Sequence, residues 1–392
     1  MKVCSYCGHN NPEEAQTCAD CGLDLPANPI PPSEPAREGP RKVSTPVTSE
    51  RPVLLSAGFF ENAEPLDVSK IDMGFSFEVG FSWPDWKKIR QSIQTAFPKD
   101  QWPQAWREAG ILWITQLKED LGGNYERYES WNFLLLSAEG EETSDSLLKI
   151  AEQTVEVVEC GLNFSTRREL YGKRVILAFN EEDDYYSYIS HFYSEGNFSR
   201  SGGMFIQTGG YAHVAFPFIG MQYVPPVLAH ELTHNCLMDL HMPRWLNEGL
   251  TMRVEKQLNR SYTTRGFNAP APILDRELAQ AHHALWNEKN IQEFWGGSSF
   301  FTPGDINKLS YNLAEIMVEL LSDNWTDFLN FVQNADPCDA GQDAALKCLD
   351  CDLGETLARF LGPGQWRPNR KAIADLWNEK RHEGNHSSYT AD

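Results

Sequence analysis

The stretch His230-Glu231-Leu232-Thr233-His234 forms an HExxH pattern, and it carries most of the information about the fold. Two histidines four residues apart on a helix differ by about 40° around its axis, so both imidazole rings face the same side. Such a pair can bind one zinc ion through a nitrogen of each ring. Glu231 lies about 100° from His230 around the helix, beside the metal, where a carboxylate can act as a general base.

The residues around this stretch predict a buried helix. Pro225 and Pro226 suit its first turn, and residues 227–242 contain neither glycine nor proline. Apolar residues recur there at spacings of three to five, which is compatible with a buried helix. The alternative interpretation is a core helix whose two histidines are satisfied by hydrogen bonds to the backbone.

A catalytic zinc needs a third protein ligand and an open fourth position. The extended pattern HExxHxxGxxH would place a histidine where this chain has Leu240, and His241 lies one residue out of register. The following segment, Pro243–Thr251, offers Glu248 instead. Because Pro243 can end one helix and open another, a short loop between two antiparallel helices would return Glu248 to the metal. The residues therefore favour Glu248, with His241 as the weaker alternative.

The HExxH stretch followed by Trp245-Leu246-Asn247-Glu248-Gly249-Leu250 resembles the gluzincin zinc metallopeptidases of the thermolysin clan, in particular the branch called peptidase MA-like. The resemblance implies an α+β fold over residues 126–380, a thermolysin-like zincin domain with a small mixed sheet, an edge strand, the HExxH helix and a following helical subdomain. It implies His230, His234 and Glu248 as ligands of a catalytic zinc and Glu231 as the catalytic base. The gap between the two motifs is shorter than in thermolysin itself.

Weaker signals elsewhere fit the same family. Residues 175–179 read as a buried strand, and residues 202–206 and 209–216 read as a hairpin. The second half of this hairpin alternates like an edge strand, and in the clan such a strand binds extended substrate by backbone pairing. The alternative is an ordinary hairpin, because glycine pairs mark turns in any protein.

Peptide hydrolysis also needs a hydrogen-bond donor for the oxyanion that develops on the carbonyl. Residues 310–321 predict a helix that resembles the tyrosine-bearing helix of the family. Tyr311 is therefore the candidate donor, with His213 as a second candidate. Thr251 and Glu255 follow Glu248 on the same helix, where either could orient a ligand, although a solvated helix face is the simpler interpretation of Glu255.

Four cysteines near the N-terminus, Cys4, Cys7, Cys18 and Cys21, form two CxxCG motifs. Residues 1–25 are too few to bury an adequate core, and four thiolates suit a tetrahedral structural zinc better than a disulfide framework. The segment resembles the short zinc ribbons of many bacterial proteins. Its charged side chains are one lysine and four carboxylates, which disfavours nucleic-acid binding and leaves docking to a protein partner as the expectation.

The rest of the chain divides by composition. Residues 26–56 contain eight prolines among polar residues and predict a disordered linker. Residues 57–125 predict two helices, near 84–96 and 103–121, that either pack on the catalytic domain or form a small helical domain before it. Residues 381–392 predict a flexible tail. Cys338, Cys348 and Cys351 could suggest a third metal, but no fourth ligand is evident, so we expect none there.

The net charge of −21 disfavours nucleic acid and anionic membranes as partners. No apolar run approaches the about 18 residues of a membrane-spanning helix, and the first ten residues lack the apolar core of a signal peptide. Thiolates held by zinc in a chain without an export signal indicate the cytoplasm.

Together these patterns predict a zinc-dependent metallopeptidase with one catalytic and one structural zinc, acting on a peptide or protein substrate. The main alternative is a non-catalytic adaptor that keeps the metal as a scaffold. The presence of Glu231 argues against the adaptor, because a metal scaffold has no need of that carboxylate. A zinc-ribbon regulator of transcription is disfavoured by the acidic charge.

Overall fold

The computed structural model describes residues 2–3, 10–12, 64–162, 172–192, 202–209, 211–263 and 271–382. Their centre is a five-stranded mixed sheet in the order β5-β6-β7-β9-β8. The strands are β5 (Glu126–Glu129), β6 (Phe133–Ser137), β7 (Arg174–Phe179), β8 (Met204–Thr208) and β9 (Tyr211–Pro217). β6, β7 and β9 run parallel to one another, while β5 and β8 pair antiparallel at the two ends.

The expected hairpin at residues 202–216 is present as β8 and β9, but the expectation that its second half is the edge strand is wrong. β9 lies between β7 and β8, with Val214 opposite Ile176 on one side and Phe205 on the other. Its residues from His213 to Pro217 are all buried, as in a strand covered on both faces. Among the described residues, β8 is the edge strand on this side of the sheet, and β5 is the edge strand on the other side.

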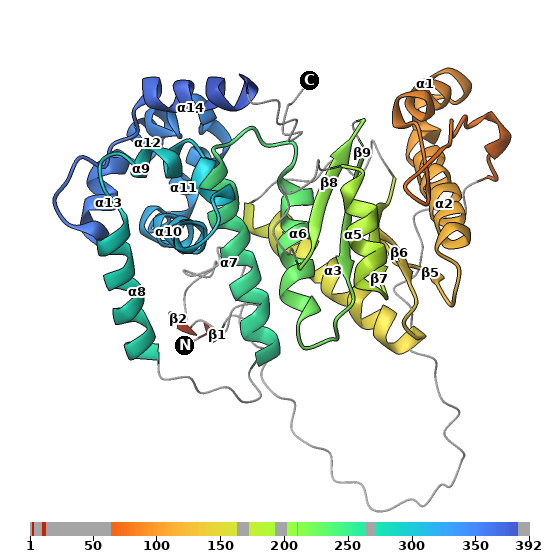
Figure 1. The fold of residues 1–392 in the computed structure, drawn as a ribbon, viewed down its shortest axis with the longest axis horizontal. Coiled ribbons are helices and arrows are strands. Elements are labelled where there is room, and N and C mark those ends of the chain that lie inside the picture. Colours follow the sequence, from red (N-terminus) through yellow and green to blue (C-terminus); the bar gives the residue numbers. More distant parts are fainter. Residues whose placement is uncertain are drawn as a thin grey trace, which may run out of the picture.

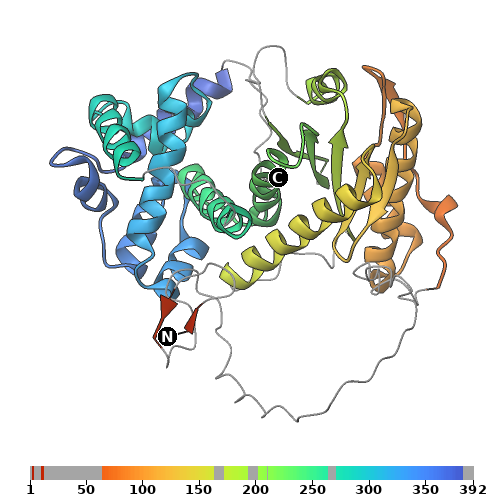
Figure 2. The ribbon, with the colours of Figure 1, turned by 90° about the horizontal axis from the view of Figure 1, so that it is seen from below.

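Helices cover both faces of the sheet (Figures 1 and 2). One face is covered by α3 (Glu141–Leu162) and α6 (Val224–Leu237), whose apolar residues pack with Phe133 and Leu135. The other face is covered by α2 (Trp102–Leu121), with Leu134 and Leu136 in a second core cluster. The alternation of neighbouring β6 residues between two cores follows from the two-residue repeat of a strand.

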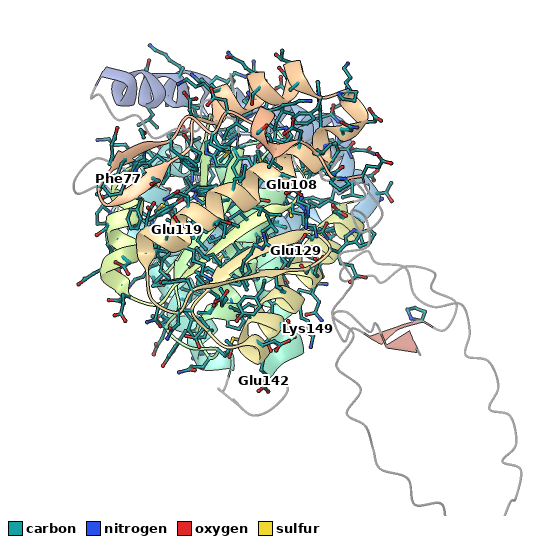
Figure 3. The ribbon with its side chains drawn as sticks, turned by 90° about the vertical axis from the view of Figure 1, so that its right-hand side faces the viewer. Phe77, Glu108, Glu119, Glu129, Glu142 and Lys149 are labelled. Atoms are coloured by element: carbon teal, nitrogen blue, oxygen red, sulfur yellow. The ribbon has the colours of Figure 1, made fainter. Side chains whose placement is uncertain are left out.

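Residues 64–121 belong to this layered unit. After η1 (Val68–Lys70) come the hairpin strands β3 (Ser76–Glu78) and β4 (Phe81–Trp83), then α1 (Trp86–Ala96), η2 (Lys99–Gln101) and α2. Figure 3 shows α2 crossing the sheet next to Glu129 of β5. Glu129 accepts from Arg107 at 2.7 Å and lies 2.6 Å from Lys173, which ties α2 to the sheet. Of the two arrangements that the sequence left open for this segment, packing on the neighbouring domain is the one observed.

The described elements that follow β9 are all helices (Figure 1). α5 (Glu182–Ser190) follows β7, α6 precedes α7 (Arg244–Thr263), and α7 packs along α10 (Asp305–Leu321). The remaining elements complete this half: α8 (Ala271–Leu285), α9 (Ile291–Trp295), η3 (Ser298–Phe301), α11 (Trp325–Asn334), η4 (Pro337–Asp339), α12 (Gln342–Cys348), α13 (Leu353–Leu361) and α14 (Arg370–His382). The described part of the chain is therefore a mixed α+β structure, as predicted.

The N-terminal region is described at two short strands. β1 (Lys2–Val3) pairs antiparallel with β2 (Asn10–Asn11), and the first CxxC motif falls between them in the sequence. Cys4, Cys7, Cys18 and Cys21 lie outside the described residues, as do the linker at 26–56 and all but the first two residues of the tail at 381–392. Among the described residues, no helix is both long and apolar enough to span a membrane.

Candidate metal centre

α6 brings the two histidines of the HExxH motif together. Val224, Pro225 and Pro226 form the first residues of this helix, as the sequence predicts. The Nε2 atoms of His230 and His234 lie 3.2 Å apart, with the ring planes at 80° to each other. Both rings therefore present the same nitrogen to one point beside the helix.

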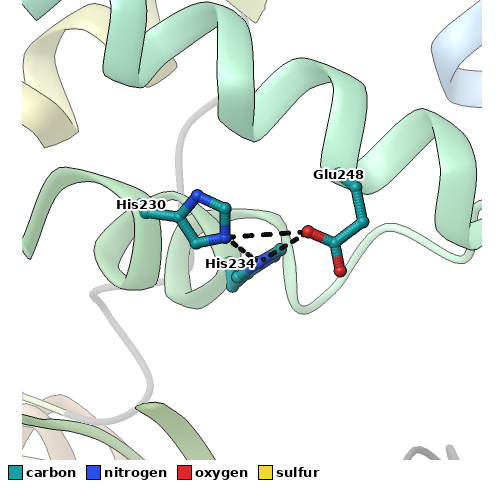
Figure 4. Close-up of side chains that lie close together, drawn as sticks. All are labelled: His230, His234 and Glu248. Carbon is teal, nitrogen blue, oxygen red and sulfur yellow. Dashed lines mark hydrogen bonds and ion pairs between the residues drawn. The ribbon is translucent and has the colours of Figure 1, made fainter. Parts of the chain in front are cut away.

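α7 supplies the third ligand atom. Glu248 Oε2 lies 3.2 Å from His234 Nε2 and 3.7 Å from His230 Nε2 (Figure 4). In a tetrahedral zinc site with bonds of about 2.0–2.1 Å, ligand atoms are separated by about 3.3 Å. The three atoms thus have the spacing of one face of a zinc tetrahedron, which leaves a fourth corner for a substrate or water.

The carboxylate of Glu248 has the environment of a metal ligand. Its side chain is 3 % exposed, and Oε2 is buried without a hydrogen bond, although it points at the two imidazoles. Burial opposes ionisation, but the nearby His234, Arg244 and His230 outweigh it and lower the pKa of Glu248 to about 2. A buried anionic oxygen without a hydrogen bond is costly unless a cation binds it. The donor set of two imidazoles and one carboxylate therefore fits a divalent metal ion.

The alternative third ligand is not in the group. α6 ends at Leu237, so His241 lies in the exposed loop before α7, and its charge acts on Asp336. Within the described residues, His230, His234 and Glu248 form the group of ligand atoms that could hold a metal ion. The pair Cys348 and Cys351 forms no such group with other described side chains.

Each histidine has a partner at its other ring nitrogen. His230 Nδ1 lies 3.2 Å from Glu255 Oε2, and His234 Nδ1 lies 2.6 Å from Asn247 Oδ1. These oxygens accept the Nδ1 proton and leave Nε2 with a free lone pair for a metal. Thr251 Oγ1 is 3.4 Å from His234 Nδ1 and also donates to the Asn247 carbonyl. Asn247 lies within the Trp245–Leu250 motif, but nothing in the sequence predicts this contact with His234.

The electrostatics of His230 follow from the surrounding carboxylates. Burial lowers the pKa of its imidazole, but the hydrogen bond with Glu255 and the charges of Glu231, Glu248 and Glu255 outweigh burial and raise the pKa to about 9. The same excess of negative charge that holds a proton on His230 would hold a metal cation in its place.

Glu231 is fixed between the helix and the edge strand. Its Oε2 accepts a hydrogen bond of 2.6 Å from the backbone N–H of Phe205 on β8. Gly203 permits this approach, because a Cβ there would lie 2.5 Å from Val227 and 3.3 Å from Glu231 Cγ. The carboxylate of Glu231 is therefore held beside the metal centre and is not part of its ligand triangle.

Tyr311 lies beside the centre, on α10. Its ring centroid is 6.2 Å from that of His230 and 5.2 Å from that of Phe300. The close packing of α7 on α10 brings it there, since a Cβ on Gly249 would lie 2.5 Å from the Ala314 carbonyl oxygen. The motif glycine next to Glu248 thus serves helix packing.

His213, the second candidate donor, is excluded by its position on the opposite face of the sheet. It is fully buried among aromatic rings, and Nε2 forms a 2.7 Å hydrogen bond with Tyr188 Oη. Burial lowers the pKa of His213 to about 3. Residues 213 and 214 point to opposite faces of β9, and Val214 packs in the core that contains α6.

No family model, curated protein or solved structure matches this chain.

Proposed function

We propose that this protein is a zinc-dependent metallopeptidase of the gluzincin type, of the peptidase MA-like branch. The observation that carries the proposal is the triangle of His230 Nε2, His234 Nε2 and Glu248 Oε2, with sides of 3.2, 3.2 and 3.7 Å. The placement of Glu231 beside that triangle, held by the edge strand, adds the base that hydrolysis needs. An edge strand next to the HExxH helix supports a thermolysin-like arrangement of the sheet.

Zinc is the metal that the donor set favours. Two imidazoles and one carboxylate with an open fourth position form an established hydrolytic zinc set. When bound, the zinc would polarise the carbonyl of a peptide bond and lower the pKa of a water molecule.

The side chains of the centre have separate tasks in this proposal. Glu231 accepts the proton of the attacking water and returns it to the leaving amine. The Phe205 N–H holds the carboxylate of Glu231 in place by a hydrogen bond. The Tyr311 hydroxyl donates a hydrogen bond to the oxyanion, a role supported by the ring's place next to His230.

β8 offers a place for an extended peptide. In the antiparallel pairing of β8 with β9, Thr208 lies opposite Tyr211 across a two-residue turn, so Phe205 and Gln207 direct their backbone groups to the free edge. The Phe205 N–H donates to Glu231, which agrees with this direction and leaves the Phe205 carbonyl and the backbone groups of Gln207 for a substrate. A substrate strand can pair along this edge and place its carbonyl next to the metal centre.

The N-terminal cysteines would form a separate structural centre. In this proposal Cys4, Cys7, Cys18 and Cys21 hold a second zinc in a zinc ribbon, which docks a substrate or a protein partner. Cys7→Ser should abolish binding of that second zinc and leave cleavage of a short peptide unchanged.

The deciding experiment combines metal analysis with a peptide-library digest. Wild type should contain two zinc ions per chain and cleave library peptides. Glu231→Gln should keep both zinc ions and reduce cleavage about 10²- to 10⁴-fold, the usual contribution of a general base. Glu277→Gln, a change of an exposed glutamate on α8, is the matched control and should behave as wild type. A wild type that holds both ions but cleaves no peptide would instead support the adaptor.

A further inference from the structure

The two carboxylate oxygens of Glu248 have different partners. Oε2 faces the two histidines, whereas Oε1 lies 3.1 Å from Nη1 of Arg244, one helical turn earlier on α7. The Glu248 side chain is 3 % exposed and that of Arg244 is 21 % exposed, so this ion pair is largely shielded from water. A shielded pair of this kind fixes the orientation of a carboxylate more strongly than a surface pair does.

Arg244 is itself held by a distant segment. Gly297, with φ of 82°, lies against its stem, and a Cβ on Gly297 would come within 3.0 Å of Arg244 Cβ. The ring of Phe301, at the end of η3, lies 4.4 Å from the guanidinium carbon. The guanidinium thus contacts both the Glu248 carboxylate and the aromatic ring of Phe301, and both contacts are favourable for an arginine.

We propose that Arg244 is a positioning residue that holds Glu248 to coordination through one oxygen and so keeps the fourth corner of the metal centre open. This inference rests on the proposed function, because it concerns the same metal centre. Arg244 touches neither the metal nor the substrate in this role. It acts through Glu248.

The chemical reason lies in the two binding modes of a carboxylate. A carboxylate can bind a metal through one oxygen or through both. If Glu248 bound through both, its second oxygen would take the corner that a catalytic zinc needs for water and substrate. The guanidinium engages Oε1 by a charge-assisted hydrogen bond, so rotation of that oxygen toward the metal would break a buried ion pair.

The contact can be tested first in metal-free protein by a double-mutant cycle. Arg244→Met leaves the buried Oε1 unpaired, so the unfolding constant should rise by more than about tenfold. The same substitution in a Glu248→Gln background should have a much smaller effect, because the charge that needs Arg244 is gone. Effects that simply add in the double variant would overturn the inference.

The coordination mode can be tested with cobalt in place of zinc. Four-coordinate cobalt absorbs visible light more strongly than five-coordinate cobalt, and His234→Ala provides the blank that removes any signal from the N-terminal cysteines. Arg244→Met should lose visible absorption relative to wild type, and Arg244→Lys, which keeps a cation near Oε1, should retain it. A wild-type spectrum in Arg244→Met would overturn the inference, as would an equal loss in Arg244→Lys.

Lys256→Met is the matched control on the same helix. Lys256 forms a half-exposed ion pair with Glu315, and its loss should leave the cobalt spectrum unchanged. If wild type binds no more cobalt than His234→Ala, the proposed zinc centre itself is wrong. The metal-free cycle would still decide whether Arg244 positions Glu248.

Discussion

In the metal-free protein, we expect the protonation of His230 to make a pH-dependent contribution to the free energy of unfolding. The imidazole is 17 % exposed, and the balance of burial against its bond to Glu255 and the charges of three carboxylates raises its pKa from 6.5 to about 9. The informative change is His230→Gln, which removes the titrating group and keeps a polar side chain of similar length. The comparison of the two proteins isolates the proton on His230.

The sign of this pH dependence follows from the direction of the pKa shift of His230. Because the pKa is higher in the folded than in the unfolded protein, protonation of His230 stabilises the fold. This stabilisation is complete below about pH 6.5 and is lost as the pH rises through about 9. At about 1.4 kcal/mol per pH unit, the difference between 6.5 and about 9 corresponds to about 3 kcal/mol.

Urea unfolding of both proteins with a chelator present, from about pH 6 to about pH 10, measures this contribution. The free energy of unfolding of wild type should fall relative to that of His230→Gln across this range, since other titrations cancel in the difference. With zinc present, the free energy of unfolding of wild type should instead rise with pH relative to that of His230→Gln. Zinc binding requires a neutral imidazole, so the stabilisation by zinc grows as His230 loses its proton. Parallel curves for the two metal-free proteins would refute the assignment of a raised pKa to His230.

Three other outcomes test a partner of His230, the packing of α7 on α10 and the turn of the β3–β4 hairpin. Glu255→Gln should weaken zinc binding about 10- to 100-fold in a chelator competition, because it loses the charged acceptor that orients His230; unchanged affinity would assign Glu255 to the solvated surface. Gly249→Ala should cost about 1–3 kcal/mol in urea unfolding, because the new Cβ would lie 2.5 Å from the Ala314 carbonyl; a neutral result would contradict the close approach of α7 and α10. Val79→Asn should gain about 0.5–1 kcal/mol by thermal unfolding, because Val79 has φ of 51° in a hairpin turn; a loss of stability would mean that the valine side chain makes a compensating contact.

The parts of the centre that the sequence predicted are those fixed by local geometry. The spacing of His230 and His234 is a property of any helix, and Pro243 directly precedes α7, although α6 already ends at Leu237 and not at Pro243. These short-range rules were enough to place Glu248 opposite the two rings. The helices at α1, α2 and α10 were also expected, with starts that differ from the observed ones by one to five residues.

The errors concern contacts between segments far apart in the chain. A strand covered on both faces and a half-exposed edge strand can show the same alternation, so the sequence could not tell that β9 is interior. His213 looked available because its face of the sheet depends on the pairing register, which a single sequence does not contain. The sequence does not single out Arg244, because its proposed role depends on contacts with Glu248, Gly297 and Phe301 that form only in the folded protein.

The division between local and long-range geometry bears on the choice between an enzyme and a metal-holding scaffold. The ligand triangle needs only α6, α7 and the loop between them. A metal-holding scaffold could therefore keep the triangle whatever other elements packed around it. The contacts of Glu231, the proposed base, and of Tyr311, the proposed oxyanion donor, need β8 packed against α6 and α10 packed against α7. At both of these approaches a glycine stands where a Cβ would collide, Gly203 against Val227 and Gly249 against Ala314. A protein that only holds a metal would not need these two close contacts beside the ligand triangle. The proposed hydrolysis needs both of them. The two glycines therefore favour the enzyme over the scaffold.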